Sequence, residues 1–270
     1  MRYAPIACFL LLACSTRHIA APKRSSSLTG TAFYKTAFPM KWAARDSFVL
    51  AQAFAGNLPE FLLKFQPVRV HITDSTTGKT IRATYWVAPD YLSIGTNADW
   101  ARVHITPYAA QRIADTLGCF LPTRKMVDDI YRAAQVKLEP VPMYAYRDST
   151  PTMYQHHLIV EGQRRGRKGL IAGIQKDVVI SGKLAHDARP DRVAIYGWHQ
   201  PDGKPIQPLY TGHIYWWVDY SQGIRLVYRK IKVNGQWMDY TDVLQHPVYR
   251  RLLCDEAFCD FYRYPSTSSG

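Results

Sequence analysis

The sequence is short of acidic residues and of long apolar runs. It has 21 Asp and Glu against 34 Lys and Arg, which gives a formal net charge of +13. Zinc-finger spacing, a helix-turn-helix pattern and an RNP-type aromatic motif are all missing, and this argues against nucleic acid as a partner. The positive charge instead predicts attraction to anionic lipid headgroups, wall polymers or acidic glycans. We expect a monomer.

The first fourteen residues are typical of an export signal. A basic start precedes an apolar run too brief to span a bilayer, and Leu11–Cys14 resembles the bacterial lipobox. The resemblance implies that residues 1–13 are a signal peptide, that Cys14 carries a lipid anchor, and that the following Ser15 directs the protein to the outer membrane. A secretory signal cut near Ala20 is the alternative, with a periplasmic or secreted product.

The rest of the chain reads as one domain between two polar ends. Residues 14–31 contain several serines and few apolar side chains, which is typical of a flexible tether. Residues 32–264 are long enough for a single domain with a sizeable core. Residues 265–270 are predicted to be a disordered tail.

Three cysteines fall inside the domain. Cys254 and Cys259 are close enough in sequence to form a disulfide bond in an oxidising compartment, which would leave Cys119 over. A bridge from Cys119 to either of the other two is the alternative.

Apolar periodicity predicts helices in the first half of the domain. Residues 43–65 have one apolar stripe, and Pro59 is expected to kink or split that helix. Two more helices are predicted at 106–117 and 121–135.

Strand signals also occur, and they dominate the second half. Residues 68–73 and 80–87 alternate with period two around a turn, which predicts a β-hairpin. After His156 the strand signals lie at 157–160, 178–181, 193–196, 213–218, 224–233 and 237–238. Asn234-Gly235 predicts a second hairpin. We therefore expect an α+β fold, a mainly antiparallel sheet with helices packed on one face.

Histidines and carboxylates in the second half suggest a catalytic site. If 213–219 is a strand, His213 and Asp219 share a face, and a loop can return His199 beside them. These three side chains would bind a catalytic zinc with one position open for water, and Asp177 would act as the base. Without metal, Ser221 would be a nucleophile served by the same histidines and aspartates. Neither HExxH nor GxSxG is present.

Aromatic residues surround these groups. An interpretation without chemistry is that they are core and rim aromatics, with both histidines hydrogen-bonded among them. In the catalytic interpretation, the substrate-binding residues are Tyr196, Trp198, Tyr215, Trp217, Tyr220 and Arg225. An aromatic groove around Trp198, Trp216 and Trp217 would also suit sugar rings without any catalysis.

Four motifs carry a family resemblance. They are LPTRKMVDDIY at 121–131, KDVVI at 176–180, YGWH at 196–199 and VDYSQGIRLV at 218–227. Together they resemble an uncharacterised family of exported bacterial proteins, which implies bacterial origin and one domain but no particular activity. The family pattern often has a histidine where this chain has Gln222, so a catalytic role of that histidine would be lost here.

The sequence thus favours an exported hydrolase that acts on a peptide or glycan polymer of the cell envelope or its surroundings. The alternative is a wall-binding or glycan-binding lipoprotein that uses the aromatic groove. The two differ in whether His199, His213 and Asp219 converge.

Overall fold

The computed structural model describes residues 15–266. The predicted signal peptide, Cys14 and residues 267–270 lie outside the described residues. The fold is mixed α+β, with 29% helix and 25% strand, which confirms the predicted class. No helix within 15–266 is long and apolar enough to cross a membrane.

Seven α-helices and two 3-10 helices are present in the described part. They are α1 (Gly30–Ala37), α2 (Trp42–Phe54), η1 (Glu60–Leu63), α3 (Pro107–Thr116), α4 (Arg124–Ala133), α5 (Thr150–Arg164), α6 (Gly182–Ala185), α7 (Tyr240–Gln245) and η2 (Tyr249–Leu252). Side chains of Thr106 and Thr123 accept backbone N–H groups at the starts of α3 and α4, as N-caps do.

A seven-stranded antiparallel sheet forms one layer. Its strands are β1 (Arg17–His18), β2 (Lys64–Thr73), β3 (Thr80–Val87), β6 (Cys119–Phe120), β13 (Val227–Tyr228), β14 (Lys230–Val233) and β15 (Gln236–Asp239). The predicted hairpin is β2–β3, paired from Gln66–Val87 to Thr73–Thr80. Asn234 and Gly235 have φ of 47° and 91° between β14 and β15, the left-handed values that a type I′ turn needs.

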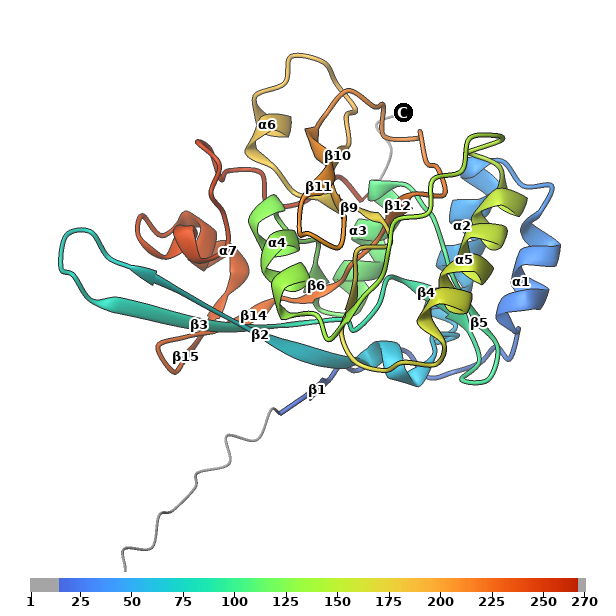
Figure 1. Ribbon diagram of the computed structural model, residues 1–270, viewed down its shortest axis with the longest axis horizontal. Helices are drawn as coiled ribbons and strands as arrows, with labels where there is room; N and C mark the ends of the chain where they lie inside the picture. The colour runs from blue at the N-terminus through green and yellow to red at the C-terminus, as the bar shows by residue number, and fades with distance from the viewer. Residues whose placement is uncertain (1–14, 267–270) are drawn as a thin grey trace, which may run out of the picture.

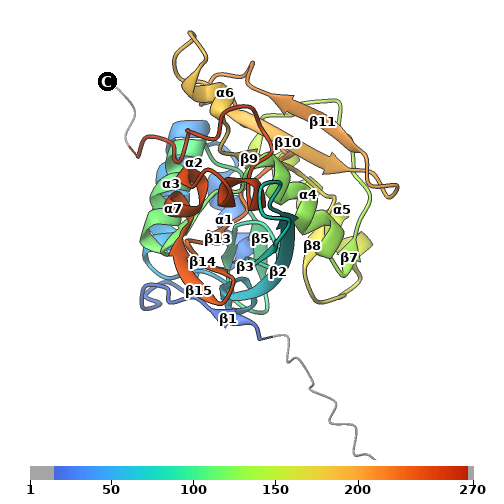
Figure 2. The same ribbon diagram turned by 90° about the vertical axis from the view of Figure 1, so that its left-hand side faces the viewer.

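A second, four-stranded sheet has the order β11-β10-β9-β12. These strands are β9 (Lys176–Val179), β10 (Ala194–His199), β11 (Pro205–Tyr210) and β12 (Gln222–Gly223). Two short pairs complete the strands: β4 (Ser93–Gly95) with β5 (Trp100–Arg102), and β7 (Val136–Lys137) with β8 (Ile171–Ala172). Figures 1 and 2 show α4 between the two sheets, where it contacts β10 on one side and β2 on the other.

Two strand predictions are wrong. Residues 157–160 belong to α5, because the Ser149 side chain caps the helix and Pro151 lies in its first turn, where a missing N–H costs nothing. Residues 213–218 form no strand apart from one bridge between Arg192 and Ile214. Stacking of Tyr215 on Tyr108, with centroids 4.3 Å apart, holds this segment against α3 instead.

The predicted helix over 43–65 and the tether over 14–31 also need correction. The helix ends at Phe54, and after Pro59 the chain passes through η1 into β2. Residues 15–29 lie against the domain: Arg17 pairs with Phe65, Ile19 is buried, and Arg24 donates to the Asn57 side chain. Pairing with a sheet edge and burial of Ile19 hold this polar segment in place.

A buried ion pair connects β5, which contains Arg102, to Asp90 and to helix α5. Nε and Nη2 of Arg102 donate to the two carboxylate oxygens of Asp90 over 2.9 and 2.7 Å, and Nη2 also lies 2.8 Å from Glu161 of α5. Burial alone would raise the pKa of Asp90, but the Arg102 guanidinium holds that pKa below its ordinary value. Asp90 is therefore ionised in the core.

We expect Asp90→Asn to lower the free energy of unfolding by about 3–5 kcal/mol, because it removes the buried counterion of Arg102 and leaves only the partly exposed Glu161. Urea denaturation of the variant and the parent protein measures the change. Asp202→Asn is the control, since the exposed pair of Asp202 with Lys204 should contribute less than about 1 kcal/mol. Equal losses in both variants would contradict the role given to Asp90.

Candidate functional site

A pocket of about 360 Å³ lies beside the small sheet. It collects charged and aromatic side chains from β9, from β11 and the segment after it, and from the loop before α5. The lining residues are Arg147, Lys176, Gln207, Tyr210, His213, Trp217 and Asp219.

Lys176 is the most unusual of these side chains. It stands in β9 opposite Gly197 of β10 and is only 7% exposed. Its Nζ lies 5.2 Å from the centroid of the Trp198 ring, and within residues 15–266 no acceptor or carboxylate is bonded to it. Burial lowers the pKa of Lys176, an effect that Asp219 opposes and Arg147 reinforces. The pocket thus holds a mostly desolvated ammonium group without a protein counterion in contact.

Asp219 is already satisfied by other groups. One of its oxygens accepts the N–H and the hydroxyl of Ser221, over 2.9 and 2.6 Å, and the other accepts Nη2 of Arg147 over 2.9 Å. Two cations, Lys176 and Arg147, therefore stand against one carboxylate, and the pocket has a net positive charge.

His213 is an aromatic, uncharged part of the lining of this pocket. Its ring lies between Tyr210 and Trp217, with centroids 5.1 and 6.1 Å away. Burial, together with the nearby Lys176 and Arg147 charges, lowers the pKa of His213 although Asp219 opposes this shift. Neutral imidazole both donates and accepts hydrogen bonds.

A second pocket, of about 310 Å³, adjoins the first at Trp217, which lines both. Its lining includes Phe38, Trp42 and Trp216, and the Trp216 side chain is 40% exposed. We call these two pockets, which share Trp217, the groove; aromatic side chains line both, and the Lys176 ammonium lies in one of them.

His199 belongs to a different place, a pocket of about 430 Å³ beside α4. Nε2 of His199 and the hydroxyl of Tyr196 both donate to the same oxygen of Asp128, each over 2.9 Å. Burial would raise the pKa of Asp128, but these two hydrogen bonds lower it below its ordinary value. The Tyr131 ring stacks on the imidazole at 4.5 Å.

A bulge in β10 allows Tyr196 and His199 to reach one carboxylate. Residues three apart on a regular strand face opposite sides. Here the register shifts between Ile195 and Gly197, and Gly197 and Trp198 have φ of 105° and 60°. A left-handed Trp is strained backbone of the kind that gathers at functional sites.

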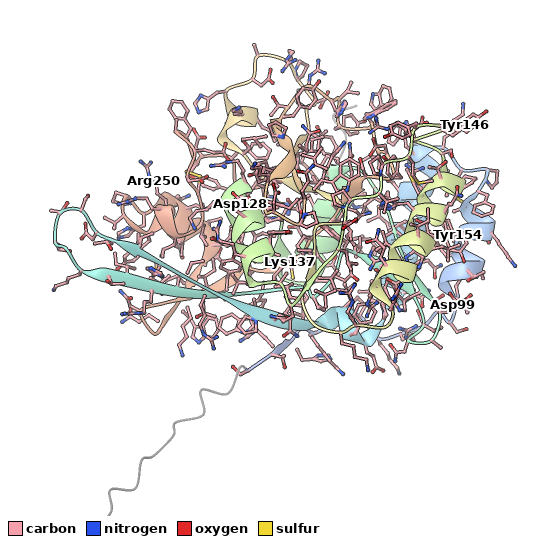
Figure 3. All side chains as sticks on the ribbon, in the orientation of Figure 1. Asp99, Asp128, Lys137, Tyr146, Tyr154 and Arg250 are labelled. Carbon is pink, nitrogen blue, oxygen red and sulfur yellow. A yellow bond between two sulfur atoms is a disulfide. The ribbon has the colours of Figure 1, made fainter. Side chains whose placement is uncertain are left out.

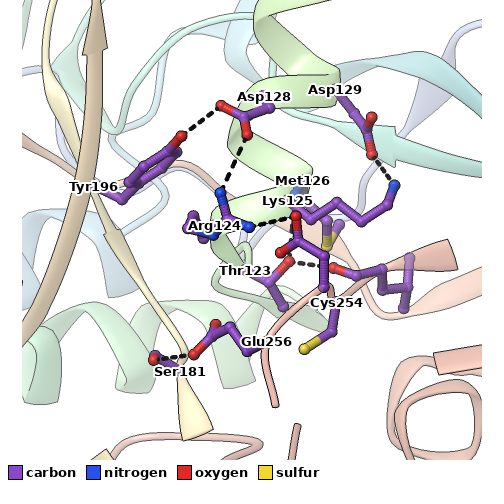
Figure 4. A network of polar contacts seen from close by, with 12 residues as sticks. Thr123, Arg124, Lys125, Met126, Asp128, Asp129, Ser181, Tyr196, Cys254 and Glu256 are labelled. Atoms are coloured by element: carbon purple, nitrogen blue, oxygen red, sulfur yellow. Dashed lines mark hydrogen bonds and ion pairs between the residues drawn. The ribbon is translucent and has the colours of Figure 1, made fainter. Parts of the chain in front are cut away.

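Arg124 supports Asp128 from the other side (Figure 4). Its guanidinium lies 3.8 Å from Asp128 and forms a closer pair with Asp255. Asp255 sits inside the loop closed by the Cys254–Cys259 disulfide, and this bond confirms the first of the predicted pairings. Cys119 is a buried free thiol.

The predicted convergence of His199, His213 and Asp219 is wrong. The backbone of His213 pairs with Val193, and His199 lies six residues further along β10, on the order of 20 Å away at the usual strand rise. His199 and His213 line separate pockets. No group of three His, Cys, Asp or Glu in 15–266 is placed to hold a metal ion, so the expected zinc ligands do not assemble.

The groups that a serine mechanism needs do not lie together either. Ser221 is fully buried, and its hydroxyl is bonded to Asp219 with no imidazole beside it in the described chain. Asp177 is buried behind the small sheet, where it accepts the Tyr91 hydroxyl over 2.9 Å. Burial raises the pKa of Asp177 to about 6, but the side chain lines neither the Lys176 pocket nor the His199 pocket.

The six predicted substrate-binding residues disperse. Trp217 lines the groove, and Tyr196 lines the His199 pocket. The other four are packed elsewhere, as core or rim side chains: Trp198, Tyr215, Tyr220 and Arg225. Tyr215 and Arg225 make identifiable contacts, with Tyr108 and with the Tyr91 ring. Gln222 is buried in β12 beside Lys176.

In the Lys176 pocket, the sequence analysis missed four lining residues: Arg147, Lys176, Gln207 and Tyr210. Lys176 had a usable signal, since it opens a strand whose other residues are apolar or Asp177. Arg147 had none, because it lies in a loop without regular structure. Figure 3 shows its neighbour Tyr146 before α5, well separated from Asp128 on α4.

Comparisons with protein-family models, with curated proteins and with solved structures gave no match.

His156, a buried residue of α5, makes stability depend on pH. Its ring is 1% exposed, packs 5.0 Å from the Tyr220 ring, and has no hydrogen-bond partner in the described residues. Burial, with the nearby Arg102, lowers the pKa of His156 from 6.5 to about 4. The unfolded chain therefore takes up this proton at a higher pH than the folded protein does.

Because the folded pKa of His156 is the lower one, the contribution of this residue to stability is complete above about pH 6.5 and is lost as the pH drops toward 4. We expect His156 to account for about 3 kcal/mol of that loss. Urea denaturation at pH 7 and pH 4 measures it in the parent protein and in His156→Leu, whose loss should be smaller by this amount. Identical losses in both proteins would contradict the assignment.

Proposed function

We propose that this protein binds an acidic glycan in the groove around Trp217 and is not an enzyme at that groove. The observation that carries the proposal is the buried Lys176 ammonium, which has no carboxylate of the described chain bonded to it, because Asp219, the carboxylate in the same lining, is bonded to Arg147 and Ser221. A bound carboxylate or sulfate would supply the missing charge, because a desolvated cation is stabilised strongly by an anion that hydrogen-bonds to it.

The remaining lining suits a carbohydrate. Trp216 and Trp217 offer apolar ring faces on which a sugar can lie, while Gln207 and neutral His213 have both donors and acceptors for hydroxyl groups. Arg147 presents a second cation at the pocket edge, where its side chain is 45% exposed. A ligand with one acidic group on a sugar ring matches this combination.

An exported location agrees with the proposal. The lipobox-like segment, the bacterial family resemblance and the disulfide favour an outer-membrane lipoprotein or a periplasmic or secreted protein, where acidic polymers of the envelope are the available ligands. We propose a monomer that binds such a polymer without a metal cofactor.

The test is binding of an oligogalacturonate, a chain of acidic sugars, by isothermal titration calorimetry. Lys176→Met should weaken binding at least tenfold, about 1.4 kcal/mol, because it removes the buried charge but retains the side-chain length. Lys204→Met is the matched control, since Lys204 is exposed in the β10–β11 turn, and its affinity should stay within twofold.

A neutral maltooligosaccharide should bind much more weakly than the oligogalacturonate. Equal binding of both sugars, or an unchanged affinity in Lys176→Met, would refute recognition of the acidic group. Circular dichroism confirms that each variant is folded.

A hydrolase is the second candidate, and the Asp128–His199 pair favours it. The carboxylate is 21% exposed to its pocket, is ionised, and is held by Tyr196, His199 and Arg124 next to a strained Trp198. An ionised, firmly held carboxylate can accept a proton from water that attacks a polymer bond.

If this candidate is right, the parent protein should release soluble fragments from bacterial cell-envelope preparations. Asp128→Asn should reduce the rate at least a hundredfold, while Asp202→Asn, in the same pocket, should retain most of it. Chromatography of the released material measures both. No release above a buffer blank would end the hydrolase proposal at this pocket and leave the binding proposal untouched.

A further inference from the structure

The large sheet has one face that no described α-helix covers. Figures 1 and 2 both show the α-helices on one side of β2, β3, β14 and β15. Strand β1 lies at the edge of this sheet, beside β2. On the covered side, Val68, Ala83 and Ile231 are buried. Side chains alternate along a strand, so the residue on either side of each of these in its strand has its side chain on the uncovered face.

This uncovered face is cationic. Strands β1, β2, β3 and β14 contain no Asp or Glu, and the Lys and Arg residues on this face are Arg17, Arg69, Arg82, Lys230 and Lys232. Arg69 pairs with Thr84, Thr84 with Lys232, and Lys232 with Trp237, so these four side chains form one row across the sheet. The one acidic residue of β15, Asp239, is buried and bonded to Arg229 and Lys230.

A cluster of aromatic residues lies at the Trp237 end of this row. The Trp237 side chain is 49% exposed, and its ring packs 5.1 Å from Trp86. Arg17 lies over Trp237 at 5.1 Å and over Tyr228 at 4.1 Å. Trp86 Nε1 donates to the carbonyl oxygen of Ser15 over 3.1 Å, so the first described residue lies at this aromatic end.

We propose that the uncovered face docks on an anionic lipid surface. Cations attract the headgroups, and an exposed Trp beside them suits the membrane interface. Ser15 follows directly after Cys14, the predicted site of lipid attachment, and residues 15–18 lie along the sheet edge. A lipid on Cys14 would therefore bring this face, rather than the Lys176 groove, to the bilayer. The inference is independent of the ligand that the groove binds.

The experiment uses the full chain with Cys14→Ser, which has no lipid, and vesicles of phosphatidylcholine with 30% phosphatidylglycerol. We expect sedimentation with these vesicles, little with pure phosphatidylcholine, and loss of binding in high salt. The variant Arg69→Gln/Arg82→Gln/Lys232→Gln should bind at least tenfold more weakly, since each cation near an anionic surface contributes severalfold.

A matched control removes the same charge elsewhere. Lys183→Gln/Arg189→Gln/Lys204→Gln changes three exposed cations outside the large sheet and should bind within twofold of the parent. Brominated lipid should also quench tryptophan fluorescence, and Trp237→Phe should lose most of that quenching even if the triple variant does not fold.

Two results would overturn the proposal. One is an equal loss in both triple variants, which would mean that net charge alone attracts the vesicles. The other is binding of the parent protein to soluble heparin but not to the anionic vesicles, which would make a dissolved polyanion the partner of this face.

Discussion

The packing of α4 against both sheets is the constraint on which the architecture depends. Met126 is fully buried, and its carbonyl accepts the Tyr85 hydroxyl of β3 over 3.4 Å. One residue later, Val127 packs among Val179 and Ala194 of the small sheet. Consecutive helical residues point about 100° apart, so one helix serves two layers. The outer sides of the two sheets consequently belong to separate surfaces.

Local rules predicted the elements whose ends carry their own signals. Thr106-Pro107 marks the start of α3, and Asn234-Gly235 makes the β14–β15 turn, because caps and left-handed turns depend on only a few neighbouring residues. The errors at 157–160 and 213–218 have the opposite cause. Strand propensity reflects packing against neighbouring strands, which neither segment has. Residues 157–160 are part of α5, and the segment 213–218 packs through the stack of Tyr215 on Tyr108.

The candidate site was less predictable than the fold. Alternation along a strand cannot anticipate the bulge at Gly197 and Trp198, which brings Tyr196 and His199 to Asp128. Asp128 itself lies about seventy residues away in sequence and in a helix. The pocket around Lys176 likewise needs Arg147 from a loop. Contacts between distant segments are set by the tertiary structure, and a single sequence contains no direct record of them.

Separation of the two outer surfaces makes their proposed roles compatible. Lys176 and its pocket belong to the small sheet, whereas Arg69, Arg82 and Lys232 belong to the large one, with α4 between the two sheets (Figure 1). Because residues 15–29 pack on the domain, no free linker of that length intervenes after Cys14. A membrane at the large sheet would leave the groove directed toward dissolved or wall-bound polymer.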